Sequence, residues 1–341
     1  MDSGATAPKS SISASIDLDA KGKHFGHIQL PYSRDEAGLS YLLVPVISIK
    51  NGDGPCLWLN AGTHGDEFEG QVALRNLVHS LQPEEISGHV LVTPSLNMPA
   101  TINNSRCSPI DNLNLNRVFP GRTGGTMTEK IAVFALAELV SRADFVVDLH
   151  AGGTRYDSLV YAMMHRYQNA ATAQATLALL RAFRAPYGVI FDTEPDRESM
   201  LDTAVEDRDK PFIAIELGGS GVLTPRSVAA TARSVRNVLV HCGLADAQIE
   251  AGQVDTEMLS VPPGGFVVAE DHGIFEPFFD LGDMIESGAA VGQLHSIHRP
   301  DRAPIVHRIK DGGRLLMRRS TGTTTHGDFL VVTATPSGPG I

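Results

Sequence analysis

The chain has 341 residues, of which 42% are hydrophobic and 20% are charged, and its formal net charge is −11. This length is enough for a sizeable core and suggests roughly two domains. An acidic chain repels phosphate backbones and anionic lipid headgroups, and no stretch approaches the roughly 18 apolar residues of a membrane span. The composition therefore argues against nucleic-acid and membrane partners.

The N-terminal residues lack a basic segment followed by an apolar one, so we expect no signal peptide and a cytoplasmic protein. Residues 1–22 are small and polar and are predicted to form a flexible tail. The three cysteines, Cys56, Cys107 and Cys242, are odd in number and widely spaced, which fits free thiols in a reducing compartment. We expect Cys56 and Cys242 to be buried, and we leave Cys107 open.

Short apolar runs alternate with helical patterns over residues 40–243, which is typical of a largely parallel or mixed sheet covered by helices. Each apolar run is bounded by turn residues and suits a strand buried on both faces. The predicted strands are 41–49, 56–61, 88–96, 143–150 and 211–217. The predicted helices are 66–81, 127–142 and 225–242, and they have apolar residues at helical spacing.

The pattern changes after residue 247, where short β-like runs at 265–269, 314–317 and 329–333 are separated by glycines. We therefore predict an α/β domain over residues 23–247. A small, sandwich-like all-β domain is predicted to follow over residues 248–341.

The segment Gly62-Thr63-His64-Gly65-Asp66-Glu67 lies between a predicted strand and a predicted helix. A spacing of three residues at a helix entry can bring the His64 imidazole and the Glu67 carboxylate to one point, and both groups bind zinc. A simpler explanation is that Asp66 and Glu67 are acids of the first helical turn, favoured by the helix dipole. The pair alone is therefore a weak signal.

Two further residues follow buried strands. His150 ends the fourth predicted strand and offers a third metal ligand, with Asp148 on the same face as a supporting acid. Glu216 is a carboxylate in an apolar strand and suits a general base beside an activated water. A histidine at a strand end or a glutamate facing solvent would be the simpler explanation of each. His64, His150 and Glu216 nevertheless share the carboxyl edge of the sheet, where α/β proteins bind ligands.

Residues 97–121 form a long connection without a clear helix or strand pattern. Such connections in compact domains are usually functional or disordered, and the many asparagines favour ordered turns. Asn116 and Arg117 offer an amide and a guanidinium fork that suit a carboxylate, and Arg106 is suited to an oxyanion. A surface ion pair is the simpler explanation for either arginine.

Four motifs in this order resemble the succinylglutamate desuccinylase/aspartoacylase family of zinc carboxypeptidase-like hydrolases. They are His64-Gly65-Asp66-Glu67, Asn114-Leu115-Asn116-Arg117-Val118-Phe119-Pro120-Gly121, Asp148-Leu149-His150 and Glu216-Leu217-Gly218. The resemblance covers about residues 23–335 and implies a zinc-carboxypeptidase-like mixed sheet flanked by helices, followed by a β-rich C-terminal part.

Within the family, three segments look most like the branch that deacetylates N-α-acetyl-L-2,4-diaminobutyrate in ectoine breakdown. They are Phe25-Gly26-His27 to Tyr32-Ser33-Arg34, Ser108-Pro109-Ile110-Asp111, and Asp148-Leu149-His150-Ala151-Gly152-Gly153. The branch implies a small N-acyl amino acid as substrate and one zinc ion per chain, and it leaves a homo-oligomer open.

The resemblance also implies site roles. The zinc ligands match His64, Glu67 and His150, the general base matches Glu216, and the pair that binds the substrate carboxylate matches Asn116 and Arg117. One position departs from the family pattern, in which the oxyanion arginine stands eight residues before the carboxylate-binding arginine. Here that position is Pro109, and Arg106 is the nearest upstream arginine. We therefore carry Arg106 as the expected oxyanion donor.

These roles predict hydrolysis of a small N-acyl amino acid. Zinc would activate a water, Glu216 would accept its proton and pass it to the leaving amine, and Arg106 would stabilise the oxyanion. The alternatives are a deacylase of N-acetyl-aspartate or N-succinyl-glutamate, a zinc carboxypeptidase, and a non-catalytic binding protein. The last should have lost a ligand or the base, and all are present.

Overall fold

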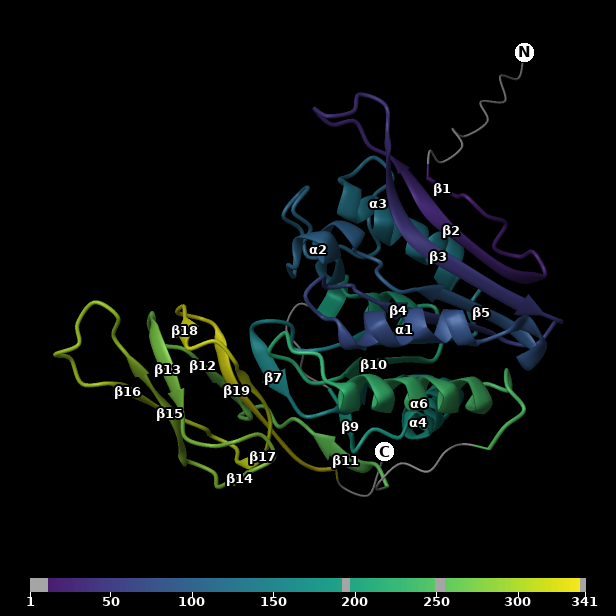
Figure 1. The fold of residues 1–341 in the computed structure, drawn as a ribbon. Coiled ribbons are helices and arrows are strands. Elements are labelled where there is room, and N and C mark those ends of the chain that lie inside the picture. Colours follow the sequence, from purple (N-terminus) through teal and green to yellow (C-terminus); the bar gives the residue numbers. More distant parts are fainter. Residues whose placement is uncertain (1–11, 192–196, 249–254, 338–341) are drawn as a thin grey trace, which may run out of the picture.

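The computed structural model describes residues 12–191, 197–248 and 255–337. Its main body is a long mixed sheet whose central strands are covered by helices (Figure 1). In spatial order the strands are β1 (Ser13–Ala14), β2 (Gly22–Pro31), β3 (Tyr41–Asn51), β5 (Gly88–Thr93), β4 (Cys56–Ala61), β6 (Phe145–His150), β10 (Phe212–Glu216), β8 (Tyr161–Met164), β9 (Tyr187–Ile190), β11 (Glu257–Ser260), β19 (Phe329–Pro336), β17 (Gly313–Arg319) and β14 (Met284–Ile285). Two short strands lie off this path: β12 (Phe266–Val268) pairs with β19, and β7 (Tyr156–Ser158) pairs with β17.

The described helices are α1 (Glu69–Ser80), α2 (Met98–Asn103), α3 (Met127–Phe134), α4 (Ala170–Phe183), α5 (Leu201–Glu206) and α6 (Pro225–His241). A π-helical segment, Ala135–Val140, continues α3, and short 3₁₀ turns cover Pro83–Glu85, Leu115–Arg117 and Arg197–Ser199. No helix among these described residues is long and apolar enough to cross a membrane.

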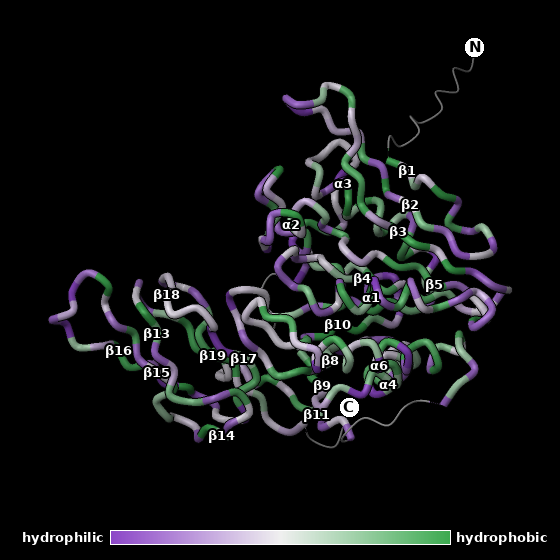
Figure 2. Tube along the Cα trace, in the orientation of Figure 1, coloured by the Kyte–Doolittle hydropathy of each residue, from purple (hydrophilic) through white to green (hydrophobic). Residues whose placement is uncertain are grey.

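Strands β5, β4, β6 and β10 run parallel. The strands that flank them run the other way, β3 antiparallel to β5 and β8 antiparallel to β10. Side chains alternate between the two faces of a strand. On one face the buried core contains Leu59, Val147 and Ile215 together with apolar side chains of α1, α4 and α6. The apolar colour follows these central strands in Figure 2. The predicted fold class, a mixed sheet flanked by helices with a small β part at the C-terminal end, is confirmed.

The helix starts are built as their sequences indicate. Thr126 accepts a hydrogen bond from the Glu129 backbone N–H, and the Glu129 carboxylate accepts one from the Thr126 backbone N–H, which forms a capping box. Thr224 and Ser227 do the same at α6, and Pro225 occupies the first turn.

The segment that precedes β2 differs from the prediction. Ile12 and Leu18 are buried, and Ser13–Ala14 pairs with β2 through the register Ser13↔Gln29. The flexible tail predicted over residues 1–22 is therefore wrong for residues 12–22, because these two apolar side chains fix the segment to the sheet. Residues 1–11 lie outside the described residues.

Beyond α6 the chain builds a second sheet of β16 (Ile305–Arg308), β15 (Ala290–His295), β13 (Gly273–Pro277) and β18 (Thr323–Thr324). This sheet shares a core with β12, β14, β17 and β19 that includes Val267, Phe275, Ile285, Leu294 and Leu330. Figure 1 shows this unit at one end of the molecule. Two pairings cross the predicted boundary at residue 247/248, namely β9 with β11 and β7 with β17.

The thiols give a test of the packing. Cys56 and Cys242 are buried, as predicted, and burial raises the pKa of each thiol to about 12, with Asp144 adding to the effect. Cys107 is partly exposed.

Because the thiolate is the reactive species, we expect only Cys107 to react quickly with a disulfide reagent in the folded protein at pH 8. A Cys107→Ser variant should lose that phase, and rapid reaction of all three thiols without denaturant would contradict the packing.

Candidate active site

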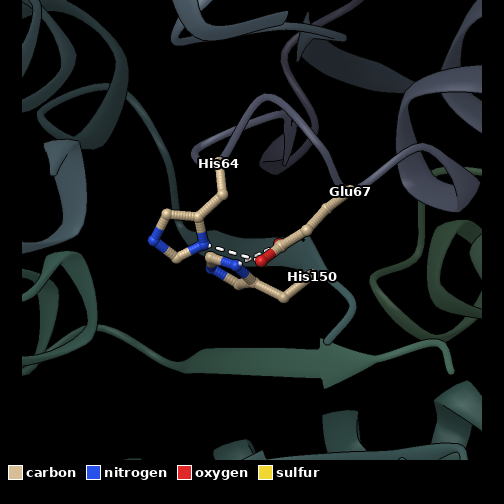
Figure 3. Close-up of side chains that lie close together, drawn as sticks. All are labelled: His64, Glu67 and His150. Carbon is tan, nitrogen blue, oxygen red and sulfur yellow. Dashed lines mark hydrogen bonds and ion pairs between the residues drawn. The ribbon is translucent and has the colours of Figure 1, made fainter. Parts of the chain in front are cut away.

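Three side chains from two segments meet at the carboxyl edge of the sheet. Glu67 follows β4, and its Oε1 lies 2.8 Å from His64 Nδ1 while its Oε2 lies 2.9 Å from His150 Nδ1 (Figure 3). The Ala151 N–H also donates to Glu67 Oε2 at 3.1 Å. All three side chains are buried, and one ligand atom from each lies within 4.8 Å of the others. The structure thus brings together the three residues that the sequence predicted as metal ligands.

Both imidazoles are oriented through their second nitrogen. His150 Nε2 lies 2.9 Å from Asp148 Oδ2, which confirms the predicted placement of Asp148 beside His150. His64 Nε2 lies 3.0 Å from Asn114 Oδ1, an oxygen that also accepts the Asn116 N–H. These partners act as acceptors, so they favour the tautomer that leaves each Nδ1 available to a metal.

A chain of buried hydrogen bonds supports Asp148 from behind. Trp58 Nε1 donates to Thr93 Oγ1, Thr93 donates to Asn60 Oδ1, and Asn60 Nδ2 donates to Asp148 Oδ1 at 2.8 Å. Thr63 also donates to the Asp148 carboxylate. Each of these hydrogen bonds is donated toward Asp148. The network therefore stabilises the charge of the Asp148 carboxylate and fixes its orientation in a part of the core that excludes water.

The charged groups of the cluster shift one another's pKa values. Burial acts to raise the pKa of Glu67, but the adjacent His64 and His150 outweigh burial and hold this pKa below its ordinary value. Burial, and then the nearby Arg106, lower the pKa of His64. Burial also opposes the charge on His150, but Asp148 and Glu67 outweigh it and raise the pKa of this imidazole. An ionised carboxylate buried between two imidazoles is a donor set suited to a divalent cation.

The donor chemistry also fits zinc. Two imidazole nitrogens and one carboxylate oxygen are a common catalytic zinc set, because the fourth position is left for water or substrate. In this protein His64, Glu67 and His150 would hold the ion. Among the described residues, this is the group of histidine, cysteine and acidic side chains close enough together to bind a metal.

The predicted base lies one strand away. Glu216 ends β10, and in the parallel register it sits directly opposite His150 of β6. On its other side it pairs with Tyr161 of β8. Directly paired residues on neighbouring strands project to the same face of a sheet, so His150, Glu216 and Tyr161 line one side of the site. All three line the same cavity, whose volume is about 380 Å³.

The long connection after β5 supplies the other predicted residues. Arg106 Nη1 lies 3.3 Å from His64 Nδ1 and 3.5 Å from Glu67 Oε1, so its guanidinium is at the metal-binding group. Asn116 Oδ1 accepts the Leu201 N–H at 2.9 Å, which leaves the amide NH₂ as the group that can donate to a ligand. Arg117 lines the cavity with Asn116, and its Nη1 donates to the Asn116 carbonyl.

The C-terminal unit forms part of the cavity wall with Phe266, Met317, Phe329 and Val332. Tyr156 also lines the cavity, and Arg319 of β17 lies over its ring at 5.4 Å. The site therefore takes part of its wall from residues beyond position 247.

The sequence alone assigned no role to Asn114, Asn60, Thr93 or Asp202. Asn60 and Thr93 are polar residues inside otherwise apolar strands, and that contrast was an available signal of a buried network. Asp202 follows a segment outside the described residues and belongs to a short helix without a clear sequence pattern.

The mixed sheet with a His–Glu–His group at its carboxyl edge has the arrangement of a metal-dependent hydrolase. The succinylglutamate desuccinylase/aspartoacylase catalytic domain model matches residues 53–242. The chain belongs to this family, whose members hydrolyse N-acyl amino acids.

One curated relative is the N-alpha-acetyl-L-2,4-diaminobutyric acid deacetylase of Halomonas elongata, which is 38% identical over 326 residues and 95% of each chain. Among solved structures, the product-bound ectoine utilization protein EutE (DoeB) from Ruegeria pomeroyi has a TM-score of 0.92 and 37% identity, covering 96% of this chain and 99% of that one. A succinylglutamate desuccinylase from Silicibacter has the same TM-score and identity, covering 97% of this chain and 100% of that one.

Removal of the charge on Asp148 tests its contact with His150. We expect Asp148→Asn to weaken zinc affinity by about 10–100-fold, because the imidazole loses its charged acceptor. A competition titration against a chelating dye measures this loss. Asp144→Asn is the matched control, since Asp144 is an exposed acid just before β6. Equal affinity in the two variants would show that Asp148 does not support the ligand.

Proposed function

We propose that this protein is a zinc-dependent amidohydrolase that removes the acetyl group from N-α-acetyl-L-2,4-diaminobutyrate. The observation that carries the proposal is the buried His64–Glu67–His150 group with Glu216 opposite His150 in the strand register. The relative from Halomonas elongata, which aligns with 95% of the chain, supports the choice of acyl group and amino acid.

Each residue has a separate part in the proposed reaction. When bound by His64, Glu67 and His150, zinc supplies Lewis acidity, which lowers the pKa of water and polarises an amide carbonyl. Glu216 accepts the proton of the attacking water and returns it to the leaving amine. Arg106 stabilises negative charge on the carbonyl oxygen.

Asn116 and Arg117 bind the α-carboxylate of the substrate in this proposal. The amide of Asn116 is fixed by the Leu201 N–H, so its NH₂ group is presented in a constant orientation. A guanidinium beside it provides charge and paired donors. By binding the carboxylate, Asn116 and Arg117 orient the scissile amide toward the metal group, and they take no part in bond breaking.

A second candidate is deacylation of another N-acyl amino acid, because a structural relative in the family is a succinylglutamate desuccinylase. Cytoplasmic location and the absence of nucleic-acid and membrane partners remain predictions from the sequence, which leaves the oligomeric state open.

Substrate choice and metal dependence can be tested together. We expect acetate release from N-α-acetyl-L-2,4-diaminobutyrate to exceed turnover of N-acetyl-aspartate, N-succinyl-glutamate and a blocked dipeptide. A chelator should abolish it, and added zinc should restore it, with about one zinc per chain by metal analysis. Activity that survives complete metal removal would overturn the proposal, and faster cleavage of the dipeptide would favour a carboxypeptidase.

The base is tested by Glu216→Gln, which keeps the size of the side chain and removes its proton-accepting charge. We expect kcat to fall by about 10²–10⁴-fold while the bound zinc stays at the wild-type amount. Steady-state kinetics and metal analysis on the same sample measure the two effects. A variant with normal kcat would exclude Glu216 as the base.

A further inference from the structure

The cavity contains one acid that the proposed reaction leaves without a role. The ionisable carboxyl and guanidinium side chains among its described lining residues are Glu67, Arg106, Arg117, Asp148, Asp202 and Glu216. Two acids belong to the metal group and its support, one is the proposed base, and the two arginines face the oxyanion and the α-carboxylate. Asp202 remains. A second carboxylate on the substrate would need a cationic partner in the cavity, whereas Asp202 is an acid.

Asp202 is placed close to the carboxylate-binding pair. Its neighbour Leu201 begins α5 and donates its backbone N–H to Asn116 Oδ1 at 2.9 Å. The side chain of Asp202 is buried, with 5% of the residue exposed, and it lines the cavity. The hydrogen bond between Asn116 and Leu201 thus couples the position of the acid to the position of the predicted carboxylate donors.

The carboxyl group is also held in a fixed orientation. Asp202 Oδ1 accepts from the Thr203 N–H and from Thr203 Oγ1. Asp202 Oδ2 lies 3.9 Å from His165 Nε2, whereas the other nitrogen of His165 is 2.7 Å from Glu206. Arg197 contacts the second oxygen of Glu206 at 2.6 Å. Glu206 therefore pairs with both His165 and Arg197, while Asp202 lines the cavity.

We infer that Asp202 is the residue that selects the side chain of the substrate by pairing with an ammonium group at its end. The inference rests on the proposed function and deepens it by naming the residue that recognises the short cationic side chain of the substrate. Such a substrate carries an anion and a cation a few bonds apart, which matches neighbouring donors at Asn116 and Arg117 and an acceptor at Asp202. A buried carboxylate next to an apolar wall also makes this pairing strong, because water competes poorly there.

The same arrangement disfavours substrates with a second carboxylate. N-acetyl-aspartate and N-succinyl-glutamate would place additional negative charge near an existing buried one. Like charges close together in a site with little water are strongly unfavourable. Asp202 would therefore act both by attraction of a cationic side chain and by rejection of an anionic one.

The test compares two substrates of nearly equal shape, N-α-acetyl-L-2,4-diaminobutyrate and N-α-acetyl-L-norvaline, which has a methyl group in place of the ammonium. We expect the wild-type zinc enzyme to prefer the cationic substrate. Asp202→Asn should lower kcat/KM for this substrate by about 10–100-fold, mainly through KM. Turnover of the norvaline derivative should stay within a few-fold of the wild type, which also shows that the variant is folded.

Asp207→Asn is the matched control, because it removes an equal charge from an exposed residue at the end of the same helix. It should leave the preference unchanged. Equal loss of both substrates in Asp202→Asn, or an unchanged preference, would overturn the inference.

Calorimetry with free L-2,4-diaminobutyrate and L-norvaline separates this inference from the proposed function. If the wild type binds the cationic amino acid more tightly and Asp202→Asn removes the difference, Asp202 selects the side chain even where no acetate is released. If acetate is released from both substrates at equal rates and both amino acids bind equally, the proposed hydrolysis stands and the role of Asp202 falls.

Discussion

The site depends on a single buried carboxylate, Glu67, which contacts groups from two different segments of the chain. Burial of an unpaired charge is unfavourable, so the fold must bring partners to it. His64 arrives from the loop after β4, and His150 and the Ala151 N–H arrive from the end of β6. The contacts that satisfy Glu67 in the protein alone bring together the three side chains that could hold a divalent cation. Fold stability would therefore depend on the same contacts as binding of such an ion.

Much of this arrangement could be predicted from the sequence because the central strands are continuous apolar runs with clear ends. Since β4, β6 and β10 are parallel, the residues that follow or end them must meet at one edge. That logic placed His64, His150 and Glu216 together without knowledge of the register. The register added what periodicity could not, namely that His150 and Glu216 are directly opposite each other.

Other parts could not be predicted because their stability comes from distant contacts. The strands β8 and β9 are four residues long, and too short for a periodic pattern to distinguish them from turns. Ile12 and Leu18 stand in a polar context and become part of the core only through packing on the sheet. Asn114 receives its place from a contact with His64, and the helix that carries Asp202 is held by the hydrogen bond from the Leu201 N–H to Asn116. No local spacing encodes such distant partners.

The pairing of β9 with β11 means that the segment shared by the family does not coincide with a folded unit. The segment that carries the family's catalytic motifs ends at residue 242, yet the sheet continues through β11 and β19 into the C-terminal unit. A chain cut between them would expose β9 as an open edge and would remove Phe329 and Val332 from the cavity wall. The matched segment is therefore shorter than the part of the chain that completes the sheet and the cavity. Fused to a different C-terminal domain, this segment would need from that domain both a strand to pair with β9 and side chains to complete the cavity wall.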